Sequence, residues 1–92
     1  MAGAEGDDRR DHLEDVPVEL ALDCRGLRCP LPVIRLANAM DDIARGGVVA
    51  VAATDPATRH DVPAWCRMRG QSYLGELAAP DGVPQYLVRR ER

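Results

Sequence analysis

The residues best suited to chemistry surround Cys29. Pro30 and Pro32 follow this cysteine and precede an apolar segment with helical spacing. Prolines are tolerated in the first turn of a helix, where their missing N–H groups would have no intrahelical partner. We therefore expect the thiol to lie at or just before a helix start, where the helix dipole favours the thiolate. Arg25 and Arg28 add positive charge nearby, so the sequence predicts a pKa below about 8.5, the ordinary value of a cysteine.

Two kinds of cysteine chemistry lack their usual partner residues in this sequence. A nucleophilic hydrolase would need a base, usually histidine, within hydrogen-bond reach of the thiol. The histidines are His12 and His60, and nothing in the sequence connects either of them with Cys29. A dithiol redox site would have C-x-x-C spacing, whereas Cys24 and Cys29 are separated by four residues. The remaining chemistry is that of a carrier, a thiol that accepts a group and passes it on.

The other two cysteines have different expected roles. Cys24 ends a predicted strand and is either a packing residue, which we favour, or a second thiol that takes part in resolving a modified Cys29. Cys66 follows Trp65 in a predicted helix and is expected in the core. We predict no metal site, because structural zinc sites usually bring at least one ligand pair at C-x₂₋₄-C spacing and the cysteines and His60 are scattered.

The elements that position Cys29 follow from hydrophobic periodicity. Residues 18–23 alternate apolar and polar side chains, which predicts a half-buried strand. Residues 24–28 are a short loop containing Gly26. A helix with one apolar face then opens at the C-P-L-P sequence and runs to about Arg45.

The middle of the chain predicts a second strand and a second helix. Residues 48–53 are a continuous run of small apolar side chains, which is typical of a covered strand. Asp55 and the proline after it resemble an N-cap and a first helical turn. Pro63 would interrupt a longer helix, so we expect a short turn and then a helix capped by Asp61 and ending near Arg69.

The C-terminal part predicts a β-hairpin. Residues 72–78 and 83–89 are strand-like, and the sequence Pro80-Asp81-Gly82 between them has the composition of a tight turn. The element order is therefore βαβαββ, and right-handed crossovers would place both helices on one face of the sheet. The expected fold is an α/β (α+β) two-layer sandwich with a four-stranded mixed sheet.

The segment LDCRGLRCPLP, at residues 22–32, resembles the signature of the TusA/SirA-like sulfur-carrier family. Later segments are similar to the family in the same order: DPAT at 55–58, DVP and a cysteine at 61–66, and DG and YLVR within 81–89. The resemblance covers residues 17–91 and implies the same βαβαββ sandwich.

The resemblance also implies a function for Cys29, which would hold sulfane sulfur as a persulfide and need no cofactor beyond this covalently carried sulfur. A cysteine desulfurase or a rhodanese-like protein would supply the sulfur. A downstream acceptor protein would receive it for tRNA thiolation, molybdenum-cofactor biosynthesis or sulfur metabolism. Arg25 and Arg28 would then stabilise the persulfide anion.

Composition separates an acidic leader from a basic domain. Residues 1–23 carry eight acids and two arginines, whereas residues 24–92 carry seven acids and ten arginines, within a net charge of −3. Residues 1–16 hold few apolar side chains, so we expect a disordered acidic tail there and one domain over 17–92. No run approaches the roughly 18 apolar residues of a membrane span, and the N-terminus lacks a signal-peptide core, so we expect a cytoplasmic protein with no membrane partner.

The alternative function is an RNA- or protein-binding regulatory module in which Cys29 is not catalytic. The fold type also resembles an RNA-contacting domain of a bacterial translation initiation factor. Phosphate contacts would then come from five arginines of the C-terminal part: Arg67, Arg69, Arg89, Arg90 and Arg92. The excess of positive charge is small, and the aromatic residues do not form a stacking stripe, so direct nucleic-acid binding is not expected. Because a carrier must release its partners, we expect a monomer.

Overall fold

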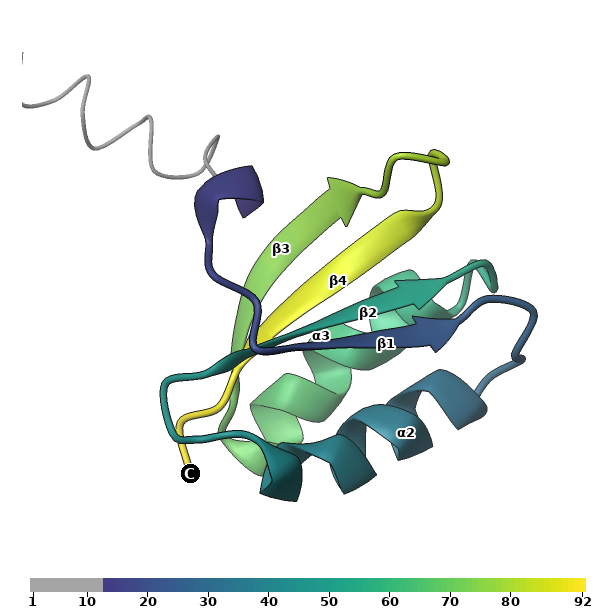
Figure 1. The fold of residues 1–92 in the computed structure, drawn as a ribbon. Helices are drawn as coiled ribbons and strands as arrows, with labels where there is room; N and C mark the ends of the chain where they lie inside the picture. Colours follow the sequence, from purple (N-terminus) through teal and green to yellow (C-terminus); the bar gives the residue numbers. More distant parts are fainter. Residues whose placement is uncertain (1–12) are drawn as a thin grey trace, which may run out of the picture.

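A four-stranded sheet forms the centre of the molecule, and two helices cover one of its faces (Figure 1). The computed structural model describes residues 13–92. The strands are β1 (Leu20–Cys24), β2 (Val48–Ala53), β3 (Ser72–Ala78) and β4 (Pro84–Arg89), in the spatial order β1-β2-β4-β3. β1 and β2 are parallel, and the other two neighbouring pairs are antiparallel. The predicted βαβαββ order and mixed sheet are therefore confirmed.

The parallel strands β1 and β2 end at the same edge of the sheet. Their last paired residues are Cys24 and Ala53. The loop that follows β1 and carries Cys29 therefore lies beside the loop that follows β2 and leads into the second helix.

The first helix is shorter than expected. α2 (Leu31–Ala39) is followed by one 3-10 turn, η2 (Met40–Asp42), instead of continuing to about Arg45. Ile43 leaves the helix in an extended conformation, with φ −121° and ψ 157°, and its side chain is buried in the core. The helical period alone does not predict this exit, because it depends on where the sheet can accept the Ile43 side chain.

The second helix corrects another expectation. α3 (Thr58–Arg69) is continuous, so the predicted break before Asp61 was wrong. Pro63 lies inside this helix. The first N–H groups of α3 bond to the carbonyls of residues 55–57, which joins the expected short turn to the helix. Pro63 therefore removes a single backbone donor from a helix that is already anchored upstream.

The main core lies between the sheet and the two helices. It contains Leu36 from α2, Val49 from β2, Trp65 and Cys66 from α3, and Tyr86 from β4. The predicted core position of Cys66 is confirmed. Among residues 13–92, no helix is long and apolar enough to cross a membrane.

A smaller apolar cluster lies on the other face of the sheet, where β2 and β4 contribute its buried side chains. Leu13 and Val16 pack against this cluster, and residues 13–15 form a single 3-10 turn there (Figure 1). Residues 1–12 of the expected tail lie outside the described residues. Residues 13–16 belong to the packed structure, because these two apolar side chains cover atoms that the helices do not reach.

Candidate functional site

Cys29 lies in the loop between β1 and α2, one residue before Pro30, the N-cap of α2. The predicted place at a helix start is confirmed. Its backbone N–H donates a 2.8 Å hydrogen bond to Oδ2 of Asp55, and Oδ1 of the same carboxylate accepts the N–H of Ala57 at 3.0 Å. The Asp55 carboxylate therefore ties the loop after β1 to the start of α3. These two hydrogen bonds, the one from Cys29 first, lower the pKa of Asp55.

Gly26 makes the second link between these loops. Its N–H donates a 2.9 Å hydrogen bond to Oγ1 of Thr54, just after β2. Its φ of 79° lies in the left-handed region, which glycine adopts at little cost. The sharp turn at Gly26 thus brings the following residues back toward the end of β2.

The thiol of Cys29 points to α3. Its Sγ donates a hydrogen bond to Oδ2 of Asp61, with 2.7 Å between the two atoms. An apolar hollow of about 270 Å³ opens beside this pair, and its other lining residues are Pro30, Val33, Ala64, Trp65 and Met68. Cys29 itself is exposed, so a reactant of moderate size reaches the sulfur from solvent.

Three large apolar side chains of the two helices are exposed, and one of them, Met68, lines the hollow. Leu31 and Ile34 of α2 are 46% and 47% exposed, and Met68 of α3 is 77% exposed. An exposed apolar group beside a reactive atom, such as Met68 beside Cys29, is typical of a surface that a partner covers.

The electrostatics at Cys29 contradict the predicted low pKa. The pKa of the thiol is raised, first by the hydrogen bond to Asp61, then by partial desolvation and by the negative charges of Asp61 and Asp55. Pro30 and Pro32 have no N–H, and the N–H of Leu31 bonds to the carbonyl of Arg28. The helix start therefore offers few donors to a thiolate, while a carboxylate accepts the thiol proton.

The expected cationic neighbours also have other partners. Arg25 forms ion pairs of 3.0 Å with both Asp81 and Asp23. These pairs raise the pKa of Arg25, and the pair with Asp81 lowers the pKa of that carboxyl. The pKa of Asp23 is lowered first by the backbone N–H of Arg25 and then by its side chain. Arg25 thus connects the loop after β1 with the turn between β3 and β4. Arg28 lines a separate hollow with Asp55. A role of Arg25 and Arg28 in stabilising a persulfide anion stays a prediction.

The other two cysteines, Cys24 and Cys66, are buried and form no disulfide. Cys24 is 0% exposed and Cys66 is 1% exposed. Burial raises the pKa of both, that of Cys66 to about 11. Cys24 therefore packs in the core of the native fold, away from solvent. In the part of the chain from Leu13 onward, no three His, Cys, Asp or Glu side chains are grouped so that they could hold a metal ion.

The contacts of two carboxylates with Cys29 were not predicted from the sequence. Asp55 was expected as an N-cap, and it accepts the N–H of Ala57 at the start of α3 but also that of Cys29. Asp61 was expected to cap the second helix, whereas its carboxylate accepts the thiol hydrogen of Cys29. The usable signal was the pairing of two parallel strands: the loops after β1 and β2 must share an edge, so polar residues in one meet the cysteine in the other.

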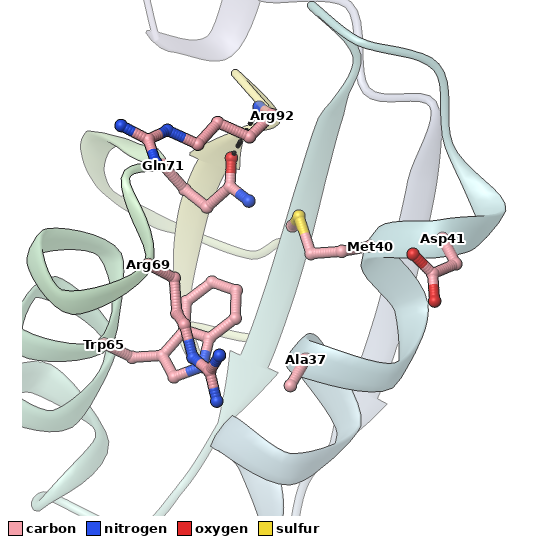
Figure 2. Close-up of a pocket in the computed structure, with 7 residues that line it drawn as sticks. All are labelled: Ala37, Met40, Asp41, Trp65, Arg69, Gln71 and Arg92. Carbon is pink, nitrogen blue, oxygen red and sulfur yellow. Dashed lines mark hydrogen bonds between the residues drawn. The ribbon is translucent and has the colours of Figure 1, made fainter.

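A third hollow, of about 310 Å³, lies toward the other ends of the two helices and does not include Cys29 (Figure 2). Its polar side chains are those of Asp41, Arg69, Gln71 and Arg92. Gln71 uses its Oε1 to accept the backbone N–H of Arg92 at 3.3 Å, which holds the end of the chain over this hollow (Figure 2). Only Arg69 and Arg92 of the five arginines in the RNA-binding alternative line it, and Asp41 opposes their charge.

Comparisons with known proteins agree with the geometry. The sequence model of the family described as "Sulfurtransferase TusA" matches residues 20–90. The sulfur carrier protein TusA of Pseudomonas paraeruginosa is 43% identical over 75 residues, which is 82% of this chain and 94% of the relative. That of Pseudomonas syringae pv. syringae is 38% identical over 79 residues, covering 86% and 93% of the two chains.

A solved structure shows the same fold. The SirA-like protein from Desulfitobacterium hafniense superposes with a TM-score of 0.67 at 24% identity, covering 79% of this chain and 99% of that one. The RNA-binding alternative finds no support in these matches. Because the family match spans nearly all the described residues and the relatives align over most of their length, the chain belongs to the TusA sulfurtransferase family.

Proposed function

We propose that this protein is a sulfur carrier that holds sulfane sulfur as a persulfide on Cys29. The observation that carries this proposal is the contrast between one exposed thiol beside an apolar hollow and two thiols buried in the core. The relatives named sulfur carrier proteins support the same chemistry.

The chemistry is an exchange between two sulfur–sulfur bonds. Sγ of Cys29 bonds to the outer sulfur of a donor persulfide, the S–S bond of the donor breaks, and its electron pair leaves on the donor thiolate. The proton of the Cys29 thiol ends on that thiolate, so the products are Cys29–S–SH and the donor thiol. No net oxidation occurs, and the protein needs no resident cofactor for this step.

The partners are a sulfur donor and a sulfur acceptor, each bound in turn. We assign the donor to the cysteine desulfurases or rhodanese-like proteins, and the acceptor to tRNA thiolation, molybdenum-cofactor biosynthesis or sulfur metabolism. The exposed side chain of Met68, which lines the apolar hollow beside Cys29, supports a docking surface at the thiol. A carrier must bind and release its partners in turn, so we propose transient contacts and a monomer, in the cytoplasmic location expected from the sequence.

Intact-mass spectrometry tests the proposal. The wild-type protein, Cys29→Ser and Cys66→Ala are each incubated with glutathione persulfide. We expect a reducible gain of about 32 Da, one sulfur atom, in the wild type and in Cys66→Ala, and none in Cys29→Ser. Equal gains in all three proteins, or no gain in any, would contradict a persulfide on Cys29.

A further inference from the structure

The contact between Cys29 and Asp61 has a consequence for the loaded state of the carrier. Sγ and Oδ2 are 2.7 Å apart, and the two residues come from different elements, the loop before α2 and the first half of α3. The carboxylate therefore contacts the atom to which the carried sulfur would be attached. A bond of Sγ to a second sulfur must change this contact.

We propose that Asp61 sets the direction of sulfur transfer, because its carboxylate stabilises the empty thiol of Cys29 relative to the loaded persulfide. This inference rests on the proposed function. The equilibrium concerned is Cys29–SH + R–S–SH ⇌ Cys29–S–SH + R–SH, in which one S–S bond forms and one breaks. Asp61 shifts it toward the empty carrier and so favours delivery of the sulfur to an acceptor.

The empty and loaded states differ in what they offer to the carboxylate. In the empty state, Sγ carries the hydrogen that Oδ2 of Asp61 accepts. In the loaded state, Sγ is bonded to carbon and sulfur and has no hydrogen. The outer sulfur belongs to a hydropersulfide, a stronger acid than a thiol, and so it bears more negative charge at neutral pH. Loading therefore replaces a hydrogen bond to a charged group with repulsion between two negative groups.

The other charged groups around Cys29 do not reverse this effect. Asp55, before α3, adds a second negative charge and accepts the backbone N–H of Cys29. Arg28, on the same loop as Cys29, lies beside Asp55. Arg25 pairs with two other carboxylates. The remaining residues that line the hollow are uncharged, so Asp61 is the group whose charge changes the balance at the sulfur.

Solvent limits the size of the effect. Cys29 is exposed, and water screens charge repulsion at a protein surface. We therefore expect about a tenfold change in the ratio of loaded to empty carrier, equivalent to one unit of pKa. The same cause acts on the thiolate, since Asp61 also raises the pKa of Cys29.

The test compares the wild type with Asp61→Asn. Asparagine has nearly the same shape and lacks the charge, and its Nδ2 can donate to a persulfide anion. Each protein is equilibrated with a fixed ratio of glutathione persulfide to glutathione and then alkylated. Intact-mass spectrometry measures the ratio of loaded to empty protein. We expect the loaded-to-empty ratio to rise about tenfold in Asp61→Asn. In parallel, the pH profile of alkylation should show a lower pKa for the Cys29 thiol.

Asp42→Asn is the matched control, because it removes an exposed carboxylate from η2, and its ratio should equal that of the wild type. Asp61→Ser is a second uncharged variant and should change the ratio in the same direction. The fluorescence of Trp65, the single tryptophan, monitors folding in each protein. An unchanged or lower ratio in both folded Asp61 variants would overturn this inference alone. Absence of loading in every protein, with normal alkylation of Cys29, would overturn the proposed function and this inference with it.

Discussion

The Cys29 thiol and the Cys66 thiol lie in neighbouring parts of the molecule with opposite surroundings. Both have a raised pKa, but the largest cause at Cys29 is a hydrogen bond to Asp61, whereas at Cys66 it is burial. Cys29 is exposed, and Cys66 is 1% exposed inside the main core. One thiol is restrained by a partner that a reaction can displace, and the other by packing that only unfolding removes.

This difference separates the molecule into two regions with different tasks. The polar site, defined as Gly26, Cys29, Thr54, Asp55 and Asp61, is built from loops and the first half of α3. The main core is built from the sheet and the inner faces of the helices. We therefore expect changes in the polar site to alter the chemistry of sulfur, and changes in the core to alter the free energy of unfolding.

The largest expected difference is in thiol reactivity. In the native protein, iodoacetamide should modify Cys29 at least about 1000-fold faster than Cys24 or Cys66, because buried thiols react only after opening events that cost several kcal/mol. Peptide mass spectrometry after timed labelling measures the three rates. In concentrated urea the three rates should converge. Comparable labelling of Cys24 and Cys29 in the folded protein would show that Cys24 belongs to the reactive region.

The second prediction concerns the core. Leu36 is 0% exposed, whereas Ile34 on the same helix is 47% exposed. Leu36→Ala should lower the free energy of unfolding by about 3 kcal/mol through lost burial and a cavity, and Ile34→Ala should change it by less than about 0.5 kcal/mol. Urea unfolding followed by Trp65 fluorescence compares the two variants. Similar losses would mean that the outer face of α2 is packed as tightly as the inner face.

The strands and their order could be predicted from local signals. The apolar run at 48–53 became β2 with the expected bounds, and the turn composition around Asp81 marked the hairpin between β3 and β4. The start of α2 followed from the two prolines after Cys29. These features depend on a few neighbouring residues, so periodicity and turn chemistry are enough to find them.

The polar site could be predicted only in part. The exposed cysteine was found from its proline-framed helix start, but its acidity depends on Asp61, which is 32 positions away in the sequence. Arg25, one of the two arginines expected to assist the thiol, instead pairs with Asp81, 56 positions away in the sequence. Contacts over such separations are set by strand pairing, so the direction of a pKa shift could not be read from charges that are close in sequence.

The third prediction uses the pH dependence of the link made by Asp55. The pKa of this carboxyl is lowered in the folded protein by the N–H groups of Cys29 and Ala57. Its contribution to stability is therefore present at neutral pH and is lost as the pH falls below the unfolded value near 3.8 and through the lower folded value. Urea unfolding between pH 7 and pH 2 should show a smaller acid loss of stability in Asp55→Asn than in the wild type. If the free energy of unfolding fell equally with pH in both proteins, Asp55 would make no pH-dependent contribution to stability.

The smallest expected effect comes from the ion pair between Arg25 and Asp81. Asp81→Asn removes the charge of one of the two carboxylates that pair with Arg25, while the ion pair with Asp23 remains. All three side chains are exposed and screened by solvent, so the pKa of Cys29 from the pH profile of alkylation should fall only slightly. The shift should be well below that of Asp61→Asn, because Asp61 contacts the sulfur directly and Arg25 acts from a distance. A shift as large as that of Asp61→Asn would show that the Arg25 ion pairs determine the pKa of Cys29. The direct contact with Asp61 would then not be the main cause that distinguishes Cys29 from the buried Cys66.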